Sequence, residues 1–167
     1  MIDNNYMTKQ NVAKFNWECR KSEMEQGDNN PVVISEDVSM LQDFYEVPVA
    51  MDKLTLEQKK EFIKFRFNFL QEEVNEGVEA ISEKDGDGVI DSLIDLVVVA
   101  VDTLLLLGVD FDKAWSEVLK ANMAKTVGVK AGRPNPLGLP DLVKDLSIWK
   151  APCHIDNLGH FQKALDS

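Results

Sequence analysis

The stretch DSLIDLVVVAVDTLLLL, residues 91–107, decides the fold of this chain. A helix that is apolar on nearly every side lies inside either a protein or a membrane. A membrane span needs about 20 apolar residues in succession, whereas the apolar run that begins at Leu96 ends at Asp102. The stretch therefore predicts a helix over residues 89–107 that is buried in a bundle.

The residues upstream predict a second long helix, over residues 55–84. Its start is a capping-box pattern (TLEQ), in which Thr55 and Gln58 satisfy free backbone amides. Gly86 and Gly88 are expected to form the turn that follows it. The apolar residues at helical spacing, expected to be its buried side, are Ile63, Phe67, Leu70, Val74, Val78 and Ile81.

Two further helices complete the predicted core. A short helix is expected from Ser35 to before Pro48, and Asp110 is expected to cap the last helix. The buried side of that last helix is expected to be Phe111, Ala114, Trp115, Val118, Leu119 and Met123. Long helices joined by short connections predict an all-α antiparallel bundle.

The two ends of the chain differ from this core. Residues 1–34 are polar and are expected to form an N-terminal arm, while residues 35–127 form the helical core of a single domain. In residues 128–167, Gly and Pro preclude a continuous helix, which predicts an irregular tail docked on the core. The candidates to anchor this tail are Leu142, Leu146, Ile148 and Trp149.

The composition limits the possible partners. The chain carries 18 Lys and Arg residues against 29 Asp and Glu, a net charge of −11. An acidic surface repels nucleic acids and anionic membranes, so neither is expected as a partner. Cys19 and Cys153 cannot form a disulfide scaffold, and the first residues do not resemble a secretion signal. We therefore expect a cytoplasmic location.

Three aspartates stand on the hydrophobic helix. At about 100° per residue, Asp91, Asp95 and Asp102 fall on one stripe that apolar residues flank. A buried carboxylate needs a cation or a proton, and Lys84 is the sole basic residue between positions 67 and 112. A divalent cation is the expected partner of these aspartates.

The preceding helix carries a matching pair of glutamates. Glu73 and Glu76 are three residues apart and hence neighbours on one side of the helix. Antiparallel packing places them opposite Asp91 and Asp95. Such oxygen ligands suit Mg²⁺, or Mn²⁺, that also binds substrate phosphates. A solvated acidic face is the alternative for the glutamates, and a wet interface is the alternative for the aspartates.

The order of these motifs resembles the all-α NTP pyrophosphatases, the superfamily of MazG-like proteins and phosphoribosyl-ATP pyrophosphohydrolases. Residues 72–76 (EEVNE) match the E-E-x-x-E half of its hallmark. In the second half, Ser92 stands where E-x-x-D has Glu, and Asp91 with Asp95 is similar to the D-x-x-x-D form. Residues 122–125 (NMAK) resemble the end of the last core helix.

The resemblance implies roles for individual residues. Glu72 would orient or deprotonate the attacking water, and Asn122 and Lys125 would approach the substrate phosphates. Asp102 is added, from its place on the helix alone, as an outer ligand or as a group behind the ligands. The residues that would hold Mg²⁺ are Glu73, Glu76, Asp91 and Asp95.

Residues outside the motifs are candidates for substrate contacts. Lys130 and Arg133 are candidates to neutralise phosphates, with a solvated tail as the alternative. Trp149 and Phe44 are the candidates for a nucleobase pocket.

These features predict a hydrolase that acts on phosphoric anhydrides. We expect a Mg-dependent nucleoside triphosphate pyrophosphohydrolase, with water attacking the α-phosphorus to release a nucleoside monophosphate and pyrophosphate. The alternatives are a phosphoribosyl-ATP pyrophosphohydrolase and, in another class, a non-catalytic metal-binding helical interaction protein. A homodimer or larger homo-oligomer, which the resemblance also implies, is expected through a second apolar face: Leu93, Val97, Val101 and Leu104.

Overall fold

The computed structural model describes residues 8–25, 33–130, 132 and 136–167 of the chain. The described residues form helices and one two-stranded sheet, which confirms the predicted all-α class. The chain divides into two compact units, each described here by itself. One unit is residues 1–109 with residues 159–167, and the other is residues 110–158.

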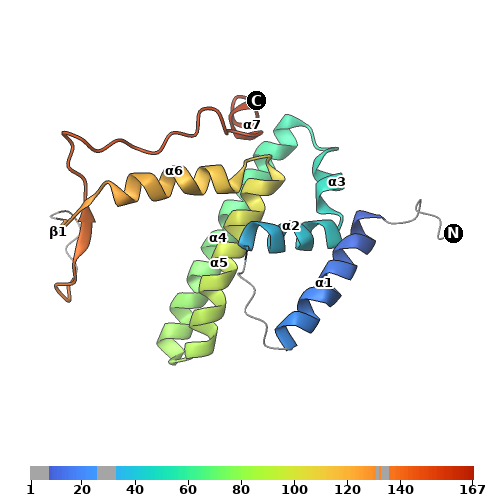
Figure 1. The fold of residues 1–167 in the computed structure, drawn as a ribbon, viewed down its shortest axis with the longest axis horizontal. Coiled ribbons are helices and arrows are strands. Elements are labelled where there is room, and N and C mark those ends of the chain that lie inside the picture. Colours follow the sequence, from blue (N-terminus) through green and yellow to red (C-terminus); the bar gives the residue numbers. More distant parts are fainter. Residues whose placement is uncertain (1–7, 26–32, 131, 133–135) are drawn as a thin grey trace. The chain divides into compact units, whose positions relative to one another are not determined.

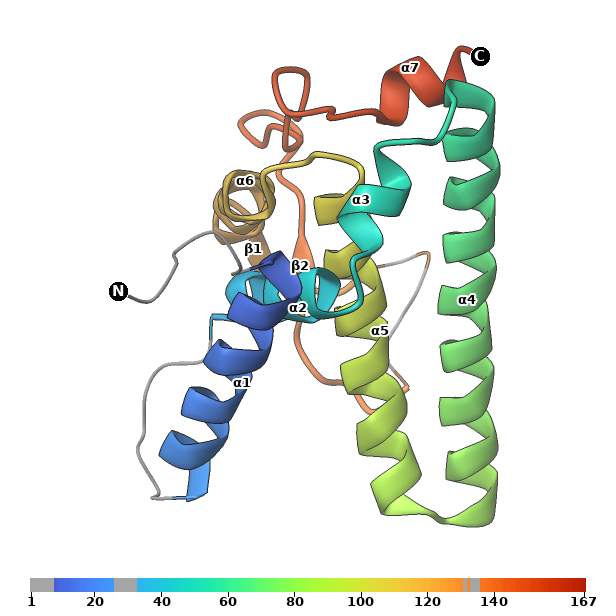
Figure 2. The same cartoon turned by 90° about the vertical axis from the view of Figure 1, so that its right-hand side faces the viewer.

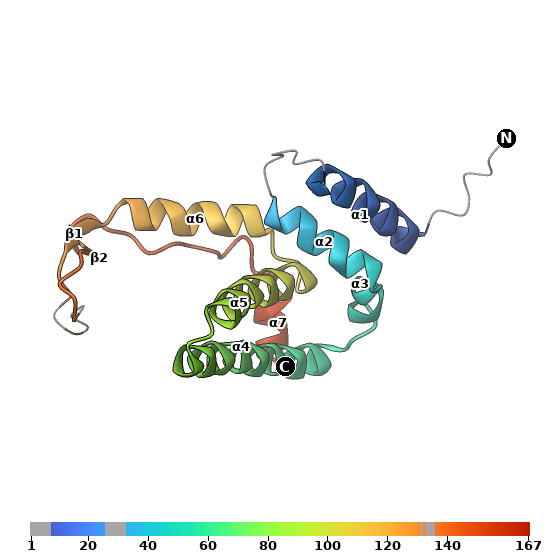
Figure 3. The ribbon, with the colours of Figure 1, turned by 90° about the horizontal axis from the view of Figure 1, so that it is seen from below.

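The first unit is built on a long antiparallel hairpin of two helices. α4 (Leu56–Glu83) and α5 (Gly86–Leu106) lie side by side, and the longer α4 extends beyond the end of α5 (Figures 1 and 2). α2 (Ile34–Phe44) packs on α5, and α1 (Lys9–Glu25) packs on α2, so these helices follow one another away from α4 (Figure 3). α1 occupies most of the described part of the predicted N-terminal arm.

The start of α4 confirms the predicted cap. The Thr55 hydroxyl accepts from the Gln58 amide at 3.2 Å, and the Gln58 side chain accepts from the Thr55 amide at 2.9 Å. α2 ends at Phe44, before Pro48 as predicted, and Pro48 itself lies in the first turn of a further short helix, α3 (Val47–Met51). Proline is tolerated there because the first helical amides have no intrahelical partner.

The turn between α4 and α5 is shorter than the sequence suggested. Lys84 ends α4 in a left-handed conformation (φ 62°), and the Asp85 side chain caps α5 by accepting from the Asp87 amide at 3.1 Å. The expectation that Gly86 and Gly88 form the turn is wrong, because the Asp85 cap allows both glycines to lie in the first turn of α5.

The side of α4 that packs on α5 differs from the predicted apolar stripe. Its buried residues are Lys59, Ile63, Arg66, Glu73 and Ala80. Several members of the predicted stripe are exposed instead, namely Phe67, Val74, Val78 and Ile81. The predicted stripe was therefore right for Ile63, which is buried, and wrong for these four residues.

The C-terminus returns to the base of the hairpin. The His160 amide donates to the Leu107 carbonyl at 2.7 Å, and α7 (Phe161–Leu165) packs against α4. Ala164 and Leu107 are both completely buried. α7 therefore contributes to the core that closes this end of the hairpin, with Met51, Ile63 and Leu106.

The second unit consists of α6 (Phe111–Met123) and a small antiparallel sheet. β1 (Thr126–Gly128) pairs with β2 (Asp141–Val143), with Thr126 opposite Val143. Asp110 caps α6 as predicted, since its side chain accepts from the Lys113 amide at 3.0 Å. The two ends of the unit are joined by Asn157, whose side chain accepts from the Asp110 amide and donates to the Asp110 carbonyl.

Two expectations about burial in the tail and in α6 are wrong. Leu142, Leu146 and Ile148 are exposed rather than anchoring, and only Trp149 is held, by its indole N–H donating to the Ala121 carbonyl at 2.7 Å. The exposed residues on the predicted buried side of α6 are Trp115, Val118, Leu119 and Met123. The C-terminus is anchored by α7, and this helix of five residues is too short to show a hydrophobic periodicity in the sequence.

Candidate metal and catalytic site

Glu73 is the deeply buried carboxylate of the α4–α5 interface. It is only 6% exposed, because α4 turns it towards α5 together with Arg66 and Ala80. Its Oε2 atom is buried and has no hydrogen-bond partner among the described residues. Burial raises the pKa of Glu73 above its usual range, since the ionised form loses its hydration. The group therefore needs a proton or a cation.

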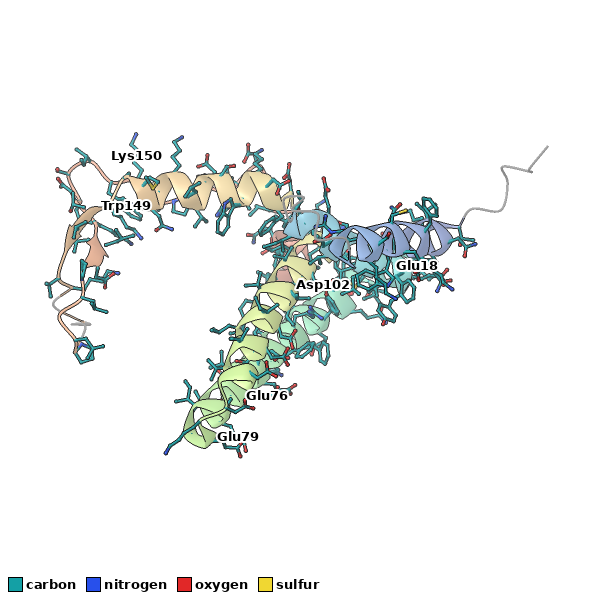
Figure 4. All side chains as sticks on the ribbon, turned by 60° about the horizontal axis from the view of Figure 1, so that its bottom comes forward. Glu18, Glu76, Glu79, Asp102, Trp149 and Lys150 are labelled. Atoms are coloured by element: carbon teal, nitrogen blue, oxygen red, sulfur yellow. The ribbon has the colours of Figure 1, made fainter. Side chains whose placement is uncertain are left out.

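The neighbouring carboxylates make this need stronger. Repulsion from four of them raises the pKa of Glu73 further; in decreasing order of effect they are Glu76, Asp95, Asp91 and Glu72. Asp95 is half-buried, and the other three are exposed. The structure thus brings the glutamates of α4 and two aspartates of α5 to the same side of the hairpin. Figure 4 shows Glu76 on this hairpin and Asp102 further along it.

The chemistry of these donors, though not their present spacing, suits a divalent cation. Within the described ranges, no three Asp, Glu, His or Cys side chains stand close enough together to share one ion. Carboxylates that face one another without a cation repel, and a cation offsets both this repulsion and the burial of Glu73. Oxygen donors of this kind are the ligands that Mg²⁺ and Mn²⁺ prefer.

The packing at Ser92 explains the departure from the E-x-x-D motif. Ser92 is buried, and a Cβ atom on Gly77 would lie only 2.5 Å from its Oγ atom. α4 and α5 therefore approach each other closely where the motif has a glutamate, and a longer side chain at position 92 would push them apart. Asp91 and Asp95 are the acidic groups that α5 offers on either side of this contact.

Asp102 lies in a different environment from the other predicted ligands. Its Oδ2 atom is 2.7 Å from Nη2 of Arg66, and its Oδ1 atom accepts from the Gln42 side chain at 2.8 Å. Arg66 also donates to the Thr103 hydroxyl at 2.8 Å and to the Val99 carbonyl at 3.1 Å. The charge of Asp102 is thus balanced without a metal.

Arg66 is the important residue that the sequence analysis missed. It directly precedes the segment 67–112, whose sole basic residue is Lys84. It also lies seven residues before Glu73, which places both on the same side of α4. Burial lowers the pKa of Arg66, while Asp102 opposes this effect; the spacing could have identified this arginine as a partner of Asp102.

The comparisons with known proteins agree with this geometry. The family model described as phosphoribosyl-ATP pyrophosphohydrolase matches residues 45–122, which contain α4, α5 and most of α6. Over these residues the chain is similar to the all-α NTP pyrophosphatase superfamily, in agreement with the resemblance of its motifs. No curated protein and no solved structure shows significant similarity to the chain.

The match supports a general activity. It indicates a pyrophosphohydrolase, a hydrolase that acts on phosphoric anhydrides, and enzymes of this family typically depend on a divalent metal. Across the part of the chain that the structure describes, no helix is long and apolar enough to span a membrane.

The predicted substrate-binding residues belong to the unit formed by residues 110–158. Lys125 Nζ donates to Asn122 Oδ1 at 2.5 Å, and Lys130 pairs with Asp141 at 3.2 Å. Arg133 lies outside the described residues. This unit carries seven Lys and Arg against six Asp and Glu, so most of the negative charge of the chain lies in the unit that holds Glu73.

Proposed function

We propose that the protein is a divalent-metal-dependent nucleoside triphosphate pyrophosphohydrolase, which releases a nucleoside monophosphate and pyrophosphate. The observation that carries this proposal is the buried Oε2 atom of Glu73, surrounded by four carboxylates that raise its pKa. Such a group is costly in an empty site and favourable beside a cation, as expected of a metal anchor.

The residues have distinct proposed tasks. Glu73, Glu76, Asp91 and Asp95 hold Mg²⁺ or Mn²⁺. The bound cation would supply positive charge to the phosphates and lower the pKa of the attacking water. Glu72, exposed beside Glu73, orients this water and accepts its proton. Lys125 acts as a point charge towards the phosphates, and Asn122 holds its ammonium group.

Phosphoribosyl-ATP is the second candidate substrate, because the matching family is described by it. The same carboxylates would serve either substrate, since both contain a phosphoric anhydride attached to an adenylate or a related nucleotide. A cytoplasmic location belongs to the proposal, and it agrees with two cysteines that are exposed and free, Cys19 and Cys153.

The test is pyrophosphate release from ribo- and deoxynucleoside triphosphates and from phosphoribosyl-ATP, with Mg²⁺ or Mn²⁺ and with EDTA. We expect release that requires the metal and falls by more than about 100-fold in Glu73→Gln. Glu79→Gln is the matched control, because Glu79 is exposed on the same helix (Figure 4), and it should remain active.

Two results would contradict the proposal. One is full activity of Glu73→Gln, which would place the chemistry elsewhere. The other is a folded wild-type protein that binds Mn²⁺ but releases no pyrophosphate from any of these compounds. The latter result would favour the non-catalytic metal-binding interaction protein.

A further inference from the structure

We propose that an aromatic row on α4, formed by Phe62, Phe65 and Phe69, is the surface on which the base of the nucleotide stacks. This inference rests on the proposed function and adds the residues that recognise the organic part of the substrate. The three rings form a continuous series, with centroid distances of 6.4 Å from Phe62 to Phe65 and 6.3 Å from Phe65 to Phe69.

The helical register places the aromatic row in line with the metal-binding carboxylates. Phe65, Phe69, Glu72 and Glu76 follow one another at spacings of four, three and four residues, which keeps them on one side of a helix. At about 1.5 Å per residue, Phe69 lies roughly 6 Å along the axis from Glu73 and roughly 10 Å from Glu76. A nucleotide has the same order of parts, with a base, a sugar and then phosphates.

The rings are accessible and are also held in place. Phe65 is 59% exposed, while Phe62 and Phe69 are half-buried. The Arg66 guanidinium lies 5.9 Å from the centroid of Phe62 and 5.4 Å from that of Phe69. The ion pair with Asp102 holds this guanidinium in place. Its contacts with the rings of Phe62 and Phe69 therefore hold the aromatic row in one arrangement before a ligand binds. Preorganised aromatic surfaces bind planar ligands with little loss of conformational entropy.

The charge around the aromatic row selects the occupant. The neighbouring carboxylates repel anionic lipid and acidic protein surfaces, whereas a base is planar and uncharged. The phosphates attached to the base would meet the carboxylates through cations. Stacking of a base on an aromatic side chain is tolerant of base identity and contributes substantially to affinity, so the aromatic row accounts for binding of the base rather than for strict discrimination between bases.

The aromatic residues suggested by the sequence are less available. The Lys144 ammonium lies over the Trp149 ring, 4.0 Å from its centroid, in a cation–π contact. The indole N–H of Trp149 donates to the Ala121 carbonyl. Phe44 is packed edge-on against Tyr45 at 5.0 Å. Neither stands in register with Glu72 and Glu76 on α4.

The experiment compares Phe65→Ala with Phe67→Ala. Phe67 is similarly exposed, at 63%, on the same helix, but it lies on the side away from the carboxylates. We measure kcat and KM for pyrophosphate release from ATP, GTP, CTP and UTP with Mn²⁺. Equilibrium binding of these nucleotides and of inorganic tripolyphosphate, which has no base, is measured in parallel.

Phe65→Ala should raise KM and weaken nucleotide binding by about 5- to 100-fold. It should leave kcat and the affinity for tripolyphosphate nearly unchanged, and Phe65→Tyr should restore KM. Phe67→Ala should change none of these values. The wild-type protein could bind nucleotides without releasing pyrophosphate. In that case, weaker nucleotide binding by Phe65→Ala than by the wild type would support the aromatic row while the proposed function fails.

Other outcomes would overturn the inference. An unchanged KM in Phe65→Ala, with Glu73→Gln inactive, would leave the function standing and remove the aromatic row from it. Equal weakening of tripolyphosphate and nucleotide would indicate a general structural role. A change in sedimentation without a change in KM would make the aromatic row a protein interface, and a wild-type protein that binds no nucleotide would contradict the inference as well.

Discussion

At the scale of single residues, the chemistry of the site depends on one buried carboxyl group. Glu73 lies against α5, and its pKa is raised by burial and by four neighbouring carboxylates. The folded protein therefore holds a proton on Glu73 at pH values where the unfolded chain has released it. A group of this kind makes stability depend on pH in a direction opposite to that of an ordinary ion-paired carboxylate.

The pH dependence of stability tests the state of Glu73 directly. In EDTA, its contribution is fully present below the unfolded pKa, about 4.3, and is lost as the pH rises through the raised folded value. The free energy of unfolding of the wild type minus that of Glu73→Gln should therefore fall with rising pH. Urea denaturation between pH 4 and pH 8 measures this difference, with Glu79→Gln as the control.

The free energy of unfolding of Glu73→Gln must be subtracted from that of the wild type, because other carboxylates make stability depend on pH in the opposite direction. The pKa of Asp156 is lowered by its bond to Lys113, and that of Asp145 by its bonds to Ser147. The contribution of each of these two carboxylates to the free energy of unfolding is lost as the pH falls. A difference between wild type and Glu73→Gln that stays flat or rises with pH would contradict the assignment of a raised pKa to Glu73.

The ion pair of Arg66 and Asp102 is the second prediction at this scale. Arg66→Met leaves Asp102 largely buried without its cation, and we expect the free energy of unfolding to fall by about 3 kcal/mol. Adding Asp102→Leu should recover much of this loss, since an apolar pair avoids burying a lone charge. Chemical denaturation of the three variants gives the coupling between the two residues.

An exposed ion pair on the same helix is the control for Arg66. Lys64 and Glu61 are 2.6 Å apart but well exposed, so Lys64→Met should cost less than about 1 kcal/mol. Equal effects of Arg66→Met and Lys64→Met would show that burial does not strengthen the Arg66 pair.

At the scale of elements, the contact of Gly77 with Ser92 sets the separation of α4 and α5. A Cβ on Gly77 would meet the Ser92 Oγ atom at 2.5 Å, and rotation of that hydroxyl would break its bond to the Val89 carbonyl at 3.1 Å. Gly77→Ala should therefore lower the free energy of unfolding by about 1–2 kcal/mol. Adding Ser92→Ala should remove the clash and restore stability.

Gly86 provides the matched control, because nothing lies within 4 Å of a Cβ built there. Gly86→Ala should be neutral or stabilising by up to about 1 kcal/mol, as alanine restricts the unfolded chain. Thermal and chemical denaturation measure both variants. A stable Gly77→Ala would mean that the two helices are free to separate at this point.

The starts of the helices were easier to predict from the sequence than their buried sides. The capping pattern of Thr55 with Gln58 and the cap at Asp110 located the starts of α4 and α6, because capping depends on residues three positions apart. The buried side of α4 was only partly predicted, since Arg66 and Glu73 are buried there beside Ile63, and polar residues do not contribute to a hydrophobic periodicity.

The candidate site was partly predictable for the same reason. The proximity of the α4 glutamates to Asp91 and Asp95 follows from two helical periods and one short connection. The pairing of Asp102 with Arg66 and Gln42 involves three helices, so no local pattern contains it. The return of α7 to Leu107 depends likewise on a contact between residues far apart in sequence.

At the scale of the whole molecule, the hairpin carries an apolar surface away from the carboxylates. The predicted association face is corrected, because Val101 is only 3% exposed and Leu104 is half-buried within the chain. Leu93 and Val97 of the predicted face are exposed, and the further exposed apolar residues of the hairpin are Phe67, Val74, Val78 and Ile81 of α4 with Ile90 and Ile94 of α5. Each of these eight side chains is at least 41% exposed.

We propose that a second copy of the chain covers this apolar surface. Two hairpins that meet through it would form a four-helix bundle while their carboxylates face away from the interface. Val78→Glu should then convert a dimer into a monomer in sedimentation experiments. Leu146→Glu, at a site in residues 110–158 that is more exposed than Val78, should leave the dimer intact. A wild-type monomer would contradict this proposal.

The most direct measurement of the central claim is a calorimetric titration of Mn²⁺ into the wild-type protein, Glu73→Gln and Glu79→Gln at pH 8. If the buried carboxylate of Glu73 anchors the metal, the wild type and Glu79→Gln bind Mn²⁺ alike, and Glu73→Gln binds at least about 100-fold more weakly. Equal Mn²⁺ affinity in Glu73→Gln and the wild type would contradict the assignment of this site.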